Sequence, residues 1–292
     1  MTKERNTKAL IKKVRKIEIK TRGLTDQIFS GDYHSAFKGQ GMSFSEVRNY
    51  QFGDDVRSID WNVTARTGEP HIKVFEEERE LTVILMVDIS PSVFTGMHRS
   101  HHELMAELCA VIAFSAAQNN DKVGLLLFSD EVELFIPPAK GKKHILRIIR
   151  EVLVREASSG RTRIGNALKH LSNIIHKRSI VFLMSDFFSE PFQKPLNVVS
   201  RRHDLIAMHI RSEFEKGHFP KGIYQFQNAE DGKRMELDAS DERQMEQWIQ
   251  YFEHHTQKIK EQFRKQGAEM IDLFADEAYI TRLHQFFSSR KK

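Results

Sequence analysis

Hydrophobic and polar positions alternate in two regular ways from residue 81 to the end of the chain. Apolar stretches of five to seven residues predict strands buried in a sheet, and they lie at 81–87, 123–128, 180–184, 204–210 and 269–273. Amphipathic stretches with helical spacing separate them, at 103–118, 143–155, 164–176, 194–200, 241–266 and 276–288. A short strand at 132–135 forms a hairpin with the strand before it, and a polar hairpin surrounds residues 231–232. Strands separated by helices imply right-handed crossovers, so we expect an α/β fold with a doubly wound, mainly parallel sheet.

The segment before residue 81 has a different character. Glycines punctuate short runs at 47–52 and 71–75, which predicts short strands joined by tight turns. The sequence therefore predicts three regions: a basic N-terminal helix at 1–32, a small β-rich module at 33–80, and the α/β domain at 81–292.

Three oxygen-bearing side chains follow the apolar run 81–87 in a D-x-S-x-S pattern: Asp88, Ser90 and Ser92. Mg²⁺ takes about six oxygen ligands, so one carboxylate and two hydroxyls make an incomplete cage that can accept a ligand from outside. An ordinary Ser/Pro turn after a strand is the alternative interpretation of the same residues.

Two further oxygen ligands come from other loops. Asp186 follows the buried strand 180–184 and Ser185, and Thr162 lies between a glycine-containing loop and the start of a helix. In open α/β sheets, ligands bind at the carboxyl ends of the strands. Asp88, Ser90, Ser92, Thr162 and Asp186 therefore form a candidate set of five oxygen ligands at one edge of the sheet.

This set resembles the metal-ion-dependent adhesion site of von Willebrand factor A-like domains, which have a doubly wound α/β fold. The resemblance implies that the five residues bind a weakly held Mg²⁺ or Mn²⁺, with hydroxyls coordinating directly and the aspartates often acting through water. It also implies that a carboxylate of a partner protein fills the open position.

Two segments before and at the first strand point to a more specific family. They are YHSAFKGQGMSFSEVRNYQFGDDVRSIDWNVTAR and IKVFEEERELTV. They are similar to the bacterial domain-of-unknown-function family fifty-eight, and the similarity covers nearly the whole chain. Members of that family are typically encoded beside MoxR-type AAA+ ATPases. The resemblance implies a non-enzymatic adaptor that works with such an ATPase, or with its client, in protein maturation or a stress response.

Arg161 and Arg163 flank Thr162, where many A domains have Gly before the threonine and Pro or Asn after it. Two cations beside a metal lower its affinity by repulsion, and they also attract the acidic side chain of a partner. We therefore expect Arg161 and Arg163 to contribute to partner binding.

The positive charge of the chain, +5 in total, is concentrated at its start, where residues 1–22 hold nine Lys or Arg and two Glu. Such a segment can bind nucleic acid, an anionic membrane surface or an acidic partner, or it can be a solvated helix face. Leu10, Val14 and Ile17 form an apolar stripe on this helix, which favours packing on the body. We expect no specific nucleic-acid binding and leave peripheral membrane contact open.

Other features lead us to expect a cytoplasmic protein. Cys109 is the single cysteine, so no intramolecular disulfide can form. The first residues are polar and basic, unlike a signal peptide, and no apolar run approaches the roughly 18 residues of a membrane span.

Enzyme classes find little support in the sequence. It contains neither the phosphate-binding loop of nucleotide hydrolases nor a dinucleotide-binding glycine motif. A phosphotransferase of the haloacid-dehalogenase type needs a second Asp where Ser90 stands. A Mg²⁺-dependent nuclease or phosphotransfer enzyme remains the alternative, and the arginines beside Thr162 are its main support.

Overall fold

The structure is a computed structural model that describes residues 12–21, 43–76, 80–91, 101–158, 161–227, 234–274 and 279–290. It divides the chain into two compact units, Phe37–Leu81 and the combination of Met1–Ala36 with Thr82–Lys292. The smaller unit differs by a few residues from the predicted module 33–80, and the N-terminal segment belongs to the larger unit.

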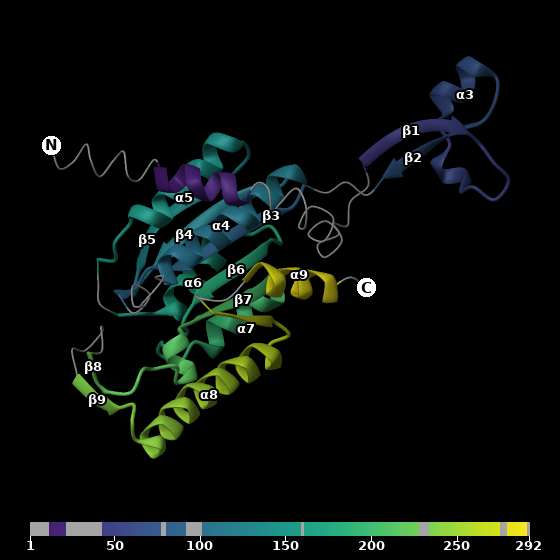
Figure 1. The fold of residues 1–292 in the computed structure, drawn as a ribbon. Coiled ribbons are helices and arrows are strands. Elements are labelled where there is room, and N and C mark those ends of the chain that lie inside the picture. Colours follow the sequence, from purple (N-terminus) through teal and green to yellow (C-terminus); the bar gives the residue numbers. More distant parts are fainter. Residues whose placement is uncertain are drawn as a thin grey trace. The chain divides into compact units, whose positions relative to one another are not determined.

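The larger unit is built on a six-stranded sheet (Figure 1), ordered β10-β7-β6-β3-β4-β5. Its strands are β3 (Thr82–Asp88), β4 (Lys122–Phe128), β5 (Val132–Ala139), β6 (Ile180–Ser185), β7 (Asp204–Arg211) and β10 (Glu269–Phe274). All pairs are parallel except β4 with β5. The strand order reverses between β3 and β6, as in doubly wound folds that bind ligands at this switch point. The predicted doubly wound, mainly parallel α/β fold is confirmed.

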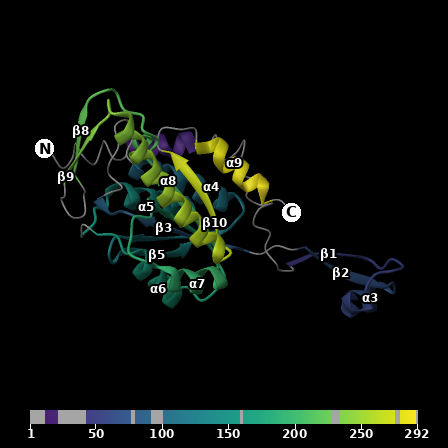
Figure 2. The same cartoon turned by 90° about the horizontal axis from the view of Figure 1, so that it is seen from below.

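Helices cover both faces of this sheet. They are α4 (His101–Gln118), α5 (Lys142–Val154), α6 (Ile164–Ile174), α7 (Gln193–Arg202), α8 (Glu242–Lys265) and α9 (Tyr279–Ser289). Figure 2 shows α6 and α7 together on one side of the sheet. Residues of α6, α7 and α8 form one core with Ile84 and Met86 of β3. On the other face, Cys109 of α4 contacts Met184 of β6, and Phe287 of α9 packs edge-on against Phe182.

Edge strand β5 is longer than the strand predicted at 132–135, because it continues through Pro137 and Pro138 to Ala139. Proline cannot donate to a ladder, so it normally ends a strand, but an edge strand tolerates it. The pairing of β5 with β4 shifts register between Val123 and Leu125, opposite this part of the strand.

Residues 12–21 are helical and are the described part of the basic N-terminal segment. Ile17 and Thr21 are buried, whereas Leu10 lies outside the described residues. Ion pairs join the helix to α4 and α5: Lys20 to Glu107 at 2.7 Å, Lys142 to Glu18 at 2.8 Å, and Lys13 to Glu103. Part of the positive charge of the segment is therefore matched by acidic side chains of the same unit.

A small hairpin of β8 (Ile223–Gln227) and β9 (Arg234–Asp238) precedes α8 and follows the short helix η4 (Glu213–Lys216). The turn predicted at 231–232 lies outside the described residues. Trp248 of α8 donates a 2.7 Å hydrogen bond to the carbonyl of Phe214, which joins η4 to the helix.

The smaller unit pairs strands β1 (Ser43–Asn49) and β2 (His71–Glu76) in antiparallel orientation, with η2 (Val56–Ser58) and α3 (Trp61–Thr67) between them. Its carboxylates are engaged structurally. Asp54 receives two 2.8 Å hydrogen bonds from the guanidinium of Arg48, and Asp60 accepts from the backbone at the start of α3. Within the described parts of both units, no helix is long and apolar enough to cross a membrane.

Candidate metal and partner site

Asp88 ends strand β3 directly beside the end of β6, at the switch point of the sheet. Val87 is in register with Met184, so Asp88 lies next to Ser185. The hydroxyl of Ser185 donates to Oδ2 of Asp88 at 2.6 Å, and the backbone N–H of Ser90 donates to Oδ1 at 2.9 Å. The carboxylate is completely buried and both of its oxygens are held in place.

Asp186 supplies a second carboxylate at the same edge. It is 5% exposed, and its Oδ1 accepts a 3.1 Å hydrogen bond from the backbone N–H of Phe188. Burial, and then the negative charge of Asp186, raise the pKa of Asp88 to about 7. Two buried carboxylates that repel one another are a place where a cation is favoured.

Thr162 lies in the loop before α6 and is 3% exposed. Its backbone carbonyl accepts a 3.1 Å hydrogen bond from the hydroxyl of Ser189, which also accepts from the N–H of Ile164 at 3.2 Å. Ser189 thus joins the Thr162 loop to the loop that carries Asp186. The hydroxyl of Thr162 is buried and has no hydrogen-bond partner within the described part of the chain.

The structure brings together most of the predicted ligand set. At the ends of β3 and β6, the N–H of Ser90 donates to Asp88, and the charge of Asp186 acts on the same carboxylate. Thr162 lines the same pocket as Asp186. Ser92 lies outside the described residues. His, Cys, Asp and Glu side chains form no group of three or more that could hold a metal in the described ranges. A metal here would therefore depend on hydroxyl ligands.

The donors present fit a hard divalent cation. They are carboxylate and hydroxyl oxygens, which suit Mg²⁺ and Mn²⁺. The unpartnered hydroxyl of Thr162 gives this fit its most specific support, because buried polar atoms are normally satisfied.

The two arginines beside Thr162 have different surroundings. Arg161 lines the pocket that contains Thr162 and Asp186. Arg163 approaches Glu190, with 3.4 Å between Nη2 and Oε1, and lines a separate depression with Lys169 and Lys194. Arg161 is therefore the better placed of the two to meet a ligand at the carboxylates.

Sequence reasoning missed three polar residues at this edge. In the sequence, Ser185 is distinguished only as the neighbour of Asp186, although it is the hydrogen-bond donor to Asp88. His101 and His255 belong to adjacent histidine pairs with little value as metal ligands, yet one ring of each pair lines the pocket. Burial lowers the pKa of both His101 and His255 to about 4, so these rings are neutral near pH 7.

Several known proteins are similar to this chain. An uncharacterised protein of Mycobacterium tuberculosis, Rv1480, is 26% identical over 96% of this chain and 89% of its own length. Among solved structures, BatB from Bacteroides thetaiotaomicron matches with a TM-score of 0.46 and 14% identity, covering 72% of this chain and 98% of its own. The VWA domain of SpRpn10 matches with a TM-score of 0.39 and 11% identity, covering 71% of this chain and 95% of its own.

The sequence also matches a described protein family over residues 46–258, a range that begins in the smaller unit and ends in α8. The match spans more than half of the 292 residues. The chain belongs to the family described as "Protein of unknown function DUF58".

Proposed function

We propose that this protein is a non-enzymatic adaptor that binds a partner protein through a weakly held Mg²⁺ or Mn²⁺. The observation that carries the proposal is the pairing of two buried carboxylates, Asp88 and Asp186, with the buried and unpartnered hydroxyl of Thr162. Asp88, Ser90, Ser92, Thr162 and Asp186 would hold the metal. When bound, the metal supplies an open coordination position that accepts a carboxylate.

The partner side chain in this proposal is an Asp or Glu. Hydroxyl ligands leave much of the charge of a divalent cation uncompensated, so an acidic group is the natural completing ligand. Arg161 lines the same pocket and would pair with the same acidic surface. We further propose that the partner is a MoxR-type AAA+ ATPase or its client, and that the two proteins act together in the cytoplasm in protein maturation or a stress response.

Calorimetric titration with MgCl₂ and MnCl₂ tests the metal part of this proposal. The Asp88→Asn variant keeps the shape of the side chain and removes its charge, so it should weaken binding by about tenfold or more. Asp130→Asn is the matched control, because Asp130 follows β4 at the same edge of the sheet, outside the proposed ligand set. Equal heats for wild type and Asp88→Asn would remove the metal from the proposal.

Surface-binding measurements against a MoxR-type ATPase from the same organism test the partner part of the proposal. Binding should fall on addition of EDTA, in Asp88→Asn and in Arg161→Ala, and it should survive in Asp130→Asn. Binding that is unchanged by EDTA and by Asp88→Asn would mean that the partner uses another surface. Cleavage of DNA in the presence of Mg²⁺ would instead support a nuclease.

A further inference from the structure

A pocket of about 770 Å³ opens beside the proposed metal site. Its far wall is aromatic and comes from β8 and α8, which contribute no residue to the metal site. Trp248 lies 4.8 Å from Phe226 and 5.1 Å from Phe252 between ring centroids. Phe188, which follows β6, stacks on His255 at 3.9 Å with an interplanar angle of 4°. These walls suit an aromatic side chain of a ligand.

Four residues that line this pocket carry buried polar atoms without a partner among the residues that the structure describes. They are His101 at both ring nitrogens, Thr162 at Oγ1, His255 at Nε2 and Gln262 at Nε2. His101 and Thr162 are 4% and 3% exposed. Unsatisfied buried groups cost free energy, and several of them around one cavity indicate that a ligand completes their hydrogen bonds.

The unpartnered atoms include both a donor and an acceptor. Both ring nitrogens of the buried His101 lack a partner in the part of the chain that the structure describes, and a neutral imidazole has one donor nitrogen and one acceptor nitrogen. The amide nitrogen of Gln262 is a second donor. A peptide main chain offers the matching N–H and C=O groups.

Two of the three acidic side chains that line the pocket form ion pairs. Glu215 is paired with Arg211 at 2.7 Å, and Glu190 with Arg163 at 3.4 Å. Lys258 makes no ion pair with any described residue. A single carboxylate on the ligand would therefore find a cation at Lys258.

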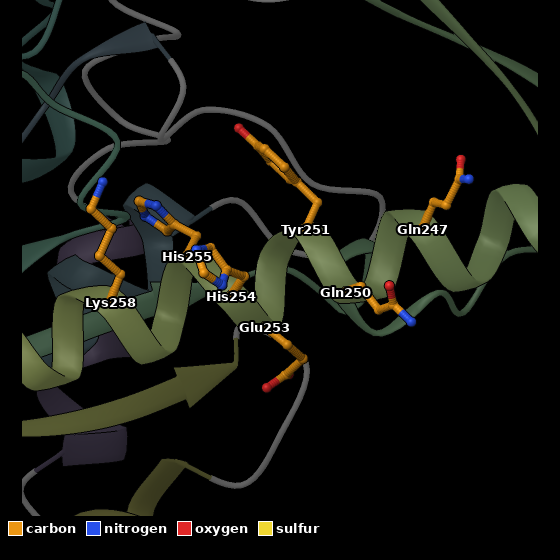
Figure 3. A pocket seen from close by; sticks show the side chains of 7 residues that line it. All are labelled: Gln247, Gln250, Tyr251, Glu253, His254, His255 and Lys258. Carbon is orange, nitrogen blue, oxygen red and sulfur yellow. The ribbon is translucent and has the colours of Figure 1, made fainter.

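A groove of about 740 Å³ continues from the pocket along α8 and shares Tyr251, His255 and Lys258 with it. Figure 3 shows these three side chains, with Gln247, rising from one face of the helix. Their spacing of three to four residues places them in a row. The combined site is therefore elongated, as an extended peptide requires.

We propose that this pocket and groove bind an extended peptide segment that places an aromatic side chain among Phe226, Trp248 and Phe252 and a carboxylate beside Lys258. The inference rests on the proposed function and specifies its partner, which would present an acidic and aromatic segment next to the metal-binding carboxylate. A nucleotide also combines a flat ring with negative charge, so AMP is the competing probe in the test.

Tryptophan fluorescence can report binding directly. The chain has two tryptophans, and Trp61→Phe removes the exposed one in the smaller unit, leaving Trp248 in the pocket as the reporter. The probe is an acetylated and amidated hexapeptide of glycines with one Asp and one Phe. We expect a saturable change with this probe, and at least about tenfold weaker binding when its Asp is replaced by Asn or its Phe by Ala.

Two variants of α8 locate the site. Lys258→Ala should weaken binding of the peptide probe by about tenfold, because the carboxylate of the probe loses its charged contact. Lys260→Ala is the matched control, since it removes an exposed lysine of the same helix that does not line the pocket, and it should change nothing. Absence of a saturable change, equal weakening by both variants, or tighter binding of AMP than of the peptide would overturn the inference.

The same titration separates this inference from the metal-dependent function. Peptide binding that persists in EDTA and in Asp88→Asn would uphold the pocket, because the single Asp of the probe pairs with Lys258 and not with the metal. Calorimetric metal binding with no response to the peptide would overturn the pocket and leave the metal site standing.

Discussion

The hydroxyl of Ser185 donates a 2.6 Å hydrogen bond to the carboxylate of Asp88, although the two residues are 97 positions apart in the chain. Ser185 also accepts a 2.9 Å hydrogen bond from the backbone N–H of Phe187. One serine therefore fixes both the orientation of Asp88 and the path of the loop that carries Asp186.

Ser185→Ala should weaken Mg²⁺ and Mn²⁺ binding by about tenfold, because residues that orient a metal ligand typically contribute that much. It should also lower the free energy of unfolding by about 1–3 kcal/mol, since a buried oxygen of Asp88 loses its donor. Ser179→Ala, at the other end of β6, is the control: its hydroxyl donates to the carbonyl of Lys177 at 2.9 Å. Calorimetry and thermal melts measure the two effects. We expect Ser179→Ala to lose stability but keep its metal affinity, and Ser185→Ala to lose both.

Thr162→Val should separate stability from binding. Valine has nearly the shape of threonine, and the hydroxyl it removes has no partner within the described chain, so the melting temperature without metal should stay the same or rise. Metal affinity should fall by about tenfold, and Thr162→Ser should retain it. A large drop in melting temperature for Thr162→Val in metal-free buffer would mean that the hydroxyl has a structural role.

Stability should fall at acidic pH through His203. Burial, followed by the charges of Arg202 and Arg178, lowers the pKa of this side chain from 6.5 to about 4. Between pH 4 and pH 6.5, His203 binds more protons in the unfolded chain than in the folded chain. Its contribution to the free energy of unfolding is therefore complete above pH 6.5 and is lost as the pH falls toward 4. The upper limit is about 1.4 kcal/mol per pH unit for one proton.

Urea unfolding of wild type and His203→Gln at several pH values between 4 and 7 measures this effect. The variant should show a shallower decline in unfolding free energy. Parallel curves for the two proteins would assign the acid sensitivity to other groups, of which His101 and His255 have pKa values lowered in the same direction.

The N-terminal helix offers a paired test of packing. Ile17 is 6% exposed and Ile19 is 68% exposed. Ile17→Ala should lower the unfolding free energy of the larger unit by about 2 kcal/mol, the low end of the range for a buried isoleucine. Ile19→Ala should be nearly neutral, and equal effects in thermal denaturation would contradict the burial of this helix face.

Much of the architecture follows from local pattern. The apolar run before Asp88 predicts a buried strand because both of its faces are apolar, and this strand is central in the sheet. The alternation with helices is likewise a local signal, so the doubly wound fold could be predicted. The extension of β5 through Pro137 and Pro138 could not, because it depends on the strand lying at the edge.

The surroundings of the site depend on contacts between distant segments. The bond from Ser185 to Asp88 requires β3 and β6 to be neighbours, and no feature of either sequence segment states that. The same holds for His101 and His255, which come from α4 and α8 and line one pocket with Thr162. The candidate ligands could be predicted from their residue types. The residues that contact them could not, because those contacts depend on the strand order.

The two prolines of β5 also govern how this protein can associate. An unprotected edge strand is a template on which another chain can add a strand, and this leads to aggregation. Pro137 and Pro138 have no N–H to offer such a strand, and they lie at the outer edge of the sheet. Addition of a strand along this part of β5 is therefore disfavoured, which lowers the tendency of the protein to polymerise through this edge.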